Sequence, residues 1–133
     1  MTRHISRTLL LAAALVVAGC SLFRDPRLHV ADITFISVPD TIRTGTTFSF
    51  TVYAMLGTHY DFVLDHIDSS RTAARFEFRV WSRDVHVSGH AYLWSIADTE
   101  LTFEARPIEP GIFRIVAYQP DRRITERIIT ILP

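Results

Sequence analysis

The sequence predicts an all-β fold, a two-sheet antiparallel β-sandwich of about seven to nine strands. From residue 30 to the end, apolar side chains recur with period two, the repeat of a half-buried strand. Helical period is nearly absent after residue 20. Turn-forming residues divide the apolar runs at intervals of about 8–12 residues, a spacing typical of a sandwich or barrel.

Two runs show the alternation most clearly, at residues 46–54 and 75–82. Their inward-facing sets are Phe48, Phe50 and Val52 in the first and Phe76, Phe78 and Val80 in the second. Such one-sided strands belong to antiparallel sheets with one face on a core. Further strands are expected over residues 30–38, 60–67, 86–94, 100–105, 112–118 and 124–132. In the last of these, the apolar residues change face around Ile128 and Ile129, which predicts a bulge or an edge position.

Turns are expected where Gly, Pro, Asp and Ser gather, because these residues preset or permit turn dihedrals. They fall at residues 39–40, 44–46, 68–70, 107–111 and 119–121. No helix is expected after residue 20.

Two motifs resemble those of bacterial immunoglobulin-like domains. Pro39-x5-Gly45, followed by an alternating strand, is similar to the start of such domains. Pro110-Gly111-Ile112-Phe113 resembles the entry to one of their late strands. The resemblance implies an immunoglobulin-like sandwich of the kind without the cysteine pair of antibody domains, with a core packed by Phe. A fold of this kind assigns no activity by itself.

The first nineteen residues have the three parts of a secretory signal. Arg3 and Arg7 precede an apolar run over residues 9–17, and small residues follow. The run is shorter than the roughly 20 residues that a membrane span needs. We therefore expect a signal helix that is cleaved from the mature chain.

The end of this segment, Val17-Ala18-Gly19-Cys20, resembles the lipobox of bacterial lipoproteins. The resemblance implies cleavage after Gly19 and lipidation of Cys20, which acyl chains would hold at a membrane. Ser21 rather than Asp at the next position implies sorting to the outer membrane. The expected organisation is a signal peptide over residues 1–19, a lipidated tether over 20–28 and one domain over 29–133, located in the cell envelope.

Composition excludes several classes of protein. The 133 residues are 48% hydrophobic, which excludes intrinsic disorder. Fourteen basic residues balance 14 acidic ones, so no broad positive field points to nucleic acid. All the basic residues are Arg, which favours a GC-rich genome, with selection for bidentate anion contacts as the alternative. A single Cys excludes an internal disulfide and a zinc-finger site.

Histidine is the first candidate for chemistry. His86 and His90 are four residues apart, which on a strand places them roughly 13 Å apart, too far for one metal ion. A turn at Gly89 would bring them together, and His59 or His66 could then join them. We favour partly exposed histidines and expect no metal site.

The carboxylates Asp61, Asp65 and Asp68 cluster near His66 and could serve acid–base chemistry or calcium. Their spacing lacks the Gly and the terminal Glu of a calcium loop, so we interpret them as surface carboxylates. There is neither a Gly-x-Ser-x-Gly elbow nor a phosphate-binding glycine loop. We therefore expect no enzyme activity and no cofactor.

An aromatic face is the strongest candidate for binding. If residues 86–94 form a strand with their small and aliphatic side chains inward, their His, Tyr and Trp side chains face outward, as do Tyr53 and Trp81 on their own strands. Exposed Trp, Tyr and Arg are enriched in binding hot spots. The candidate binding residues are Trp81, His90, Tyr92, Trp94 and Arg79, which would engage a protein or a sugar. In the alternative, these aromatics pack into the sandwich.

Four arginines recur at every fourth residue: Arg71, Arg75, Arg79 and Arg83. We interpret them as a solubilising stripe that protects a sheet edge, with glycan or phosphate binding as the alternative. Together these features predict a membrane-anchored, non-catalytic lipoprotein whose domain mediates protein–protein interaction in the envelope. The alternatives are a module that binds a sugar or a metal, and a lipid-anchored inhibitor or chaperone-like accessory that offers loops or an open strand edge.

Overall fold

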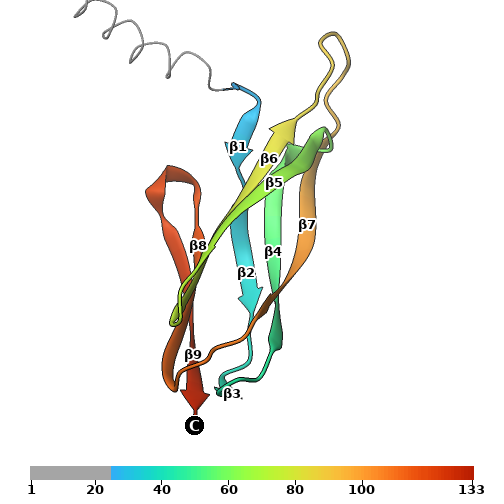
Figure 1. Ribbon diagram of the computed structural model, residues 1–133. Helices are drawn as coiled ribbons and strands as arrows, with labels where there is room; N and C mark the ends of the chain where they lie inside the picture. The colour runs from blue at the N-terminus through green and yellow to red at the C-terminus, as the bar shows by residue number, and fades with distance from the viewer. Residues whose placement is uncertain (1–24) are drawn as a thin grey trace, which may run out of the picture.

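The computed structural model describes residues 25–133, so the expected signal peptide, Cys20 and Ser21 lie outside the described residues. The described chain forms nine strands and one short 3₁₀ turn, η1 (Pro120–Arg122). The strands are β1 (Leu28–Val30), β2 (Asp32–Ser37), β3 (Thr41–Arg43), β4 (Phe48–His59), β5 (Phe62–Arg71), β6 (Arg75–Asp84), β7 (Trp94–Ala105), β8 (Gly111–Tyr118) and β9 (Ile124–Leu132) (Figure 1). In this part of the chain, no helix is long and apolar enough to cross a membrane.

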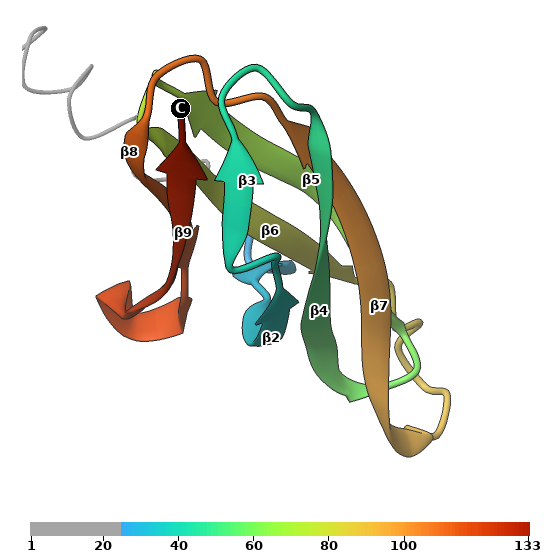
Figure 2. The ribbon, with the colours of Figure 1, turned by 90° about the horizontal axis from the view of Figure 1, so that it is seen from below.

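The strands form two sheets, which confirms the all-β, sandwich-like expectation. One sheet has the order β2-β4-β7, and Figure 2 shows β4 and β7 side by side along their length. The other has the order β1-β6-β8-β9-β3, with β5 on the far side of β6. Most pairs are antiparallel, but β3 pairs with β9, and β6 with β8, in parallel.

The core lies between the inward faces of β4 and β6, as the alternation predicted. Phe103 of β7 is the centre of a cluster of aromatic rings, with centroids 5.3, 5.6 and 5.1 Å from those of Phe50, Phe76 and Phe78. The last three side chains are almost fully buried. Burial of each contributes about 1.5–3 kcal/mol, so this cluster holds the two sheets together.

A buried amide also joins the two sheets. Gln119, directly after β8, accepts a hydrogen bond from the Ile33 N–H at 2.7 Å through Oε1. Its Nε2 donates to the Ile33 carbonyl at 2.8 Å and to Thr125 Oγ1 at 2.7 Å. The side chain thereby satisfies two buried backbone groups of β2, which need partners away from water.

The expected strand over residues 86–94 is wrong. Residues 85–93 form a loop between β6 and β7, and β7 begins only at Trp94, opposite His59. Gly89 has a φ of +89° and the His90 N–H bonds the Val87 carbonyl at 3.2 Å, so the chain turns in the middle of the run. Period two in a sequence makes a strand only where a neighbouring strand pairs with it.

The expected turn at residues 68–70 and the expected single strand over residues 30–38 also differ from the structure. The predicted turn at residues 68–70 is strand, paired with β6, and the turn lies at residues 72–74. Residues 30–38 form two strands, because the chain passes from one sheet to the other at Ala31. Strand β9 was expected to have a bulge or to lie at an edge, and it pairs with β8 without a bulge. On the side of β9 away from β8, β3 pairs only with the last three residues, so the rest of that side is an edge, as expected.

The start of the described chain is joined to β6. The Asp84 N–H donates to the Arg27 carbonyl at 2.9 Å, and Asp25 forms an ion pair with Arg83. Residues 25–28, which were expected to belong to a tether, therefore pack against the domain.

Candidate functional site

The five candidate binding residues fall into two groups. Arg79 and Trp81 lie on β6, on the sheet face that points away from the core. Tyr92 and His90 belong to the loop over residues 85–93, and Trp94 is the first residue of β7. The single outward aromatic face expected from the sequence is thus divided between a sheet face and a loop.

Arg79 is the centre of the first group. Its guanidinium carbon lies 5.2 Å from the ring centroid of Tyr118 and 5.7 Å from that of Trp81. Trp81 in turn stacks on His66 of β5 at 5.7 Å, with ring planes 16° apart. We call the row formed by Tyr118, Arg79, Trp81 and His66 the aromatic–arginine face.

Hydrogen bonds fix the aromatic–arginine face at both ends. The Tyr118 hydroxyl donates to Glu77 Oε2 at 2.8 Å, and the Trp81 Nε1–H donates to Asp68 Oδ2 at 2.8 Å. The bond to the Glu77 carboxylate raises the pKa of Tyr118 above its usual value, because ionisation would place two negative charges together. The phenol therefore stays a neutral donor in ordinary buffers.

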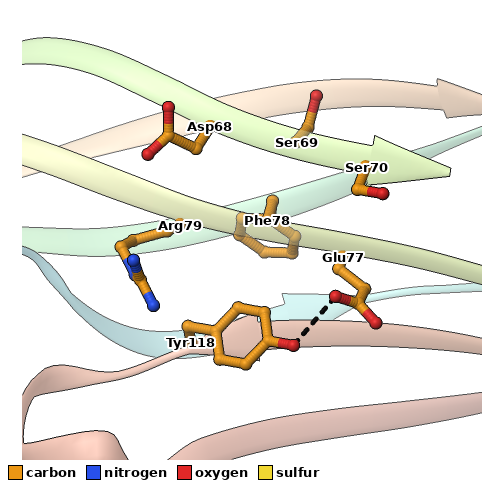
Figure 3. Close-up of a pocket in the computed structure, with 7 residues that line it drawn as sticks. All are labelled: Asp68, Ser69, Ser70, Glu77, Phe78, Arg79 and Tyr118. Atoms are coloured by element: carbon orange, nitrogen blue, oxygen red, sulfur yellow. Dashed lines mark hydrogen bonds between the residues drawn. The ribbon is translucent and has the colours of Figure 1, made fainter.

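A shallow hollow adjoins this face. Asp68, Ser69 and Ser70 of β5 and Glu77, Phe78 and Arg79 of β6 line it together with Tyr118 (Figure 3). Its volume is about 180 Å³, smaller than the roughly 300–1,000 Å³ of sites that enclose a drug-sized ligand. The hollow suits a protruding side chain better than an enclosed small molecule.

The second group packs around a buried histidine. His59, at the end of β4, is 5% exposed. Its ring lies 4.5 Å from Phe62, 4.8 Å from Tyr92 and 6.2 Å from Trp94, measured between centroids. His86 stacks on Tyr92 at 3.8 Å. These contacts hold the loop against the ends of β4 and β5, while His90 is exposed.

The histidines do not assemble as a metal site. The turn at Gly89 exists, and His59 lies close to His86, but His66 is part of the aromatic–arginine face on β5. Across residues 25–133, no group of three or more His, Cys, Asp and Glu side chains is placed to hold a metal ion.

Of the three carboxylates expected near His66, Asp65 and Asp68 lie beside its ring, whereas Asp61 does not. Asp61 bonds His86 Nδ1 at 2.6 Å, and Asp68 accepts from Trp81. Asp65 accepts from Arg83 Nε at 2.5 Å and contacts His66 Nδ1 at 2.5 Å. The bond from Arg83, followed by that from His66, holds the pKa of Asp65 below its usual value.

Each arginine of the four-residue stripe has a partner within the chain. Arg71 lies over the Phe76 ring at 4.8 Å, and Arg75 forms an ion pair with Glu77 at 2.5 Å. Arg83 bridges Asp65 and Asp25. Arg75, Arg79 and Arg83 lie on β6, which pairs with β1, β5 and β8, so this stripe lies on an interior strand and does not protect a sheet edge as expected.

The sequence did not indicate Tyr118 or Glu77 as site residues, and it suggested His59 only as a possible partner of His86 and His90. Tyr118 reaches Arg79 because β6 and β8 pair in parallel, with Phe78 opposite Ala117. Neither the sequence distance between these residues nor the alternation in β8 signals that neighbourhood. Continued alternation from Phe48 would point His59 outward, and it is buried because the register of β4 against β7 shifts between Met55 and His59, which no local pattern signals.

In comparisons with protein-family models, curated proteins and solved structures, nothing matches this chain. The functional conclusion therefore depends on the residues and their geometry alone.

Proposed function

We propose that this protein is a lipid-anchored, non-catalytic module of the bacterial cell envelope that binds a protein partner through the aromatic–arginine face. The aromatic–arginine face is the observation that carries the proposal. The Val17-Ala18-Gly19-Cys20 motif supports the anchor at Cys20, and Ser21 supports the outer membrane as its location.

An immunoglobulin-like arrangement is part of this proposal. The order β2-β4-β7 matches the A-B-E order of one immunoglobulin sheet, and the β8–β9 hairpin takes the place of strands F and G. The parallel pair β6–β8 departs from that pattern, because the sheets of immunoglobulin domains are antiparallel. The proposed domain is therefore a variant of the immunoglobulin arrangement in which β6 and β8 run in the same direction.

The aromatic–arginine face has the composition and rigidity of a binding hot spot. Trp, Tyr and Arg dominate hot spots, because they bury much area, and Trp and Tyr also lose little side-chain freedom on binding. Here Tyr118 and Trp81 are already held by their bonds to Glu77 and Asp68, and Arg79 lies between them. A partner that covers this face would desolvate a prearranged cation–π pair, which strengthens it.

Site-specific photo-crosslinking in intact cells tests the proposal. A benzophenone amino acid replaces Ser70, which is exposed and lines the hollow, in the full chain. We expect a defined adduct with one envelope protein, lost on Trp81→Ala and on Arg79→Ala. Matched controls are Tyr53→Ala, on the outer face of the other sheet, and Arg114→Ala, whose partner is Glu126.

An adduct that survives both Trp81→Ala and Arg79→Ala would remove the aromatic–arginine face from the proposal. Mass spectrometry of Cys20 and co-sedimentation with outer membranes test the anchor separately. An unmodified Cys20 thiol would refute the anchor without bearing on the face.

A second candidate is partner binding by strand addition, favoured by one observation. Strand β5 pairs only with β6, and nearly all its residues are exposed, so in the described chain its outer edge is open over ten residues. An extended segment of a protease or of an unfolded client could add there. A benzophenone adduct from Ser70 that persists in the Trp81→Ala and Arg79→Ala variants, yet is lost on Ser69→Pro, would favour this mode.

A further inference from the structure

The end of the sandwich next to the start of the described chain is unusually apolar. Sixteen large hydrophobic side chains of residues 25–133 are exposed, and nine of them fall within residues 60–64 and 85–96. Among the most exposed of these nine are Trp94 at 74%, Leu93 at 67%, Tyr60 at 62% and Val87 at 59%. We call these four side chains the apolar tip. Solvated single hydrophobic residues are ordinary, but a group at one end of a molecule marks a contact surface.

Hydrogen bonds and ring contacts hold the apolar tip in one conformation. The Tyr60 N–H bonds the Leu93 carbonyl at 3.3 Å, and the Val85 N–H bonds the Asp61 carbonyl at 2.8 Å. Within the loop, the ring of Tyr92 contacts those of His59 and His86 and lies 5.4 Å from that of Trp94. The surface therefore exists before any contact is made, which lowers the entropy cost of docking.

The loop that carries the apolar tip has no formal charge. Residues 85–93 contain no Asp, Glu or Arg, and His86 is bonded to Asp61. Trp and Tyr with aliphatic neighbours and without charges are the side chains that favour the boundary between water and lipid.

The chain leading to Cys20 emerges at this same end. Strand β1 runs antiparallel to β6, so the chain before Leu28 passes Asp84 and approaches the start of the loop. Figure 1 shows the start of β1 and the β6–β7 loop at one end of the molecule and the C-terminus at the other. Four residues lie between Cys20 and Asp25, and the five residue-to-residue steps from one to the other span at most about 18 Å.

We propose that the apolar tip is a membrane-contact surface that seats the domain, end on, in the headgroup layer of the leaflet that holds the lipid at Cys20. This inference rests on the lipid anchor of the proposed function. The short reach of the chain keeps the apolar tip close to the lipid surface, so its local concentration there is high and weak insertion suffices. End-on seating leaves the aromatic–arginine face, along the side of the sandwich, free for its partner.

Fluorescence quenching by brominated phosphatidylcholine tests the seating. The full chain, as cells produce it, is reconstituted in vesicles of phosphatidylethanolamine and phosphatidylglycerol with and without the brominated lipid. A Trp81→Phe variant leaves Trp94 as the one fluorophore, and a Trp94→Phe variant leaves Trp81. We expect contact with the vesicles to shift the emission of Trp94 to the blue and the brominated lipid to quench it, with Trp81 unaffected in both respects.

A matched pair of variants separates the apolar tip from general hydrophobicity. Leu93→Ser removes a 67% exposed side chain of the apolar tip, and Ile108→Ser removes a 65% exposed one between β7 and β8. Burial of one large aliphatic side chain changes partitioning by about tenfold. Leu93→Ser should therefore markedly reduce the quenching of Trp94, whereas Ile108→Ser should leave it unchanged.

Different results would refute the lipid anchor and the seating of the apolar tip. If Cys20 carries a free thiol, the anchor is refuted, and the same thiol is coupled to a maleimide lipid in the vesicles so that the seating is still measured. Unquenched Trp94 in the membrane-attached protein would overturn the seating. In that case, a benzophenone adduct at Leu93 with an envelope protein would assign the apolar tip to a protein interface instead.

Discussion

Replacing Gln119 with leucine removes the polar link between the two sheets while keeping a side chain of similar length. The variant loses the bonds of Gln119 to both the N–H and the carbonyl of Ile33, a residue that is 4% exposed. It also loses the bond to Thr125.

The expected cost follows from these contacts. A buried backbone group left unpaired costs about 1–3 kcal/mol, and two are left on Ile33. The added apolar burial of leucine returns roughly 1 kcal/mol. With about 2 kcal/mol for each unpaired group, the net loss is about 3 kcal/mol. For a domain of about 110 residues, this lowers Tm by roughly 10–15 °C.

Thermal and urea unfolding of the full chain, followed by far-ultraviolet circular dichroism, measures the loss. The matched control is Thr125→Val, which removes only the third bond and should cost about 1 kcal/mol. If Gln119→Leu lowers Tm no more than Thr125→Val does, the amide does not link the sheets as described.

Two further predictions concern packing and pH. A methyl group at Gly57 would overlap the Phe62 ring. Gly57→Ala should therefore cost about 1–3 kcal/mol of stability in denaturant unfolding, and adding Phe62→Val should recover part of that loss. If the stability losses of the two substitutions simply add in the double variant, the overlap is contradicted. Arg83 lowers the pKa of Asp65 in the folded state. This pairing stabilises the fold above the unfolded pKa of about 3.9 and is lost as pH falls through the lower folded-state pKa. The stability difference between the natural protein and Arg83→Leu should therefore shrink below pH ~4 in urea titrations, and a pH-independent difference would refute the pairing.

The sequence by itself determined the class of fold and the inward face of its principal strands. Phe48, Phe50 and Val52 lie inside because a strand with one buried face must alternate, and that alternation is local. The turns around Gly45 and Pro120 were predictable for the same reason, since the chemistry of a few residues decides them. The ends of strands were harder to predict, because pairing with β6 keeps Ser69 and Ser70 in β5 despite their preference for turns.

Only the tertiary structure decided which side chains meet. The run over residues 86–94 alternates like a strand, yet it has no pairing partner and turns at Gly89. Tyr118 reaches Arg79 through a parallel pairing of β6 with β8, and Gln119 reaches Ile33 across the two sheets. Such neighbours are set by the order and direction of strands, which depend on how all the apolar faces are buried at once, and no local pattern records that.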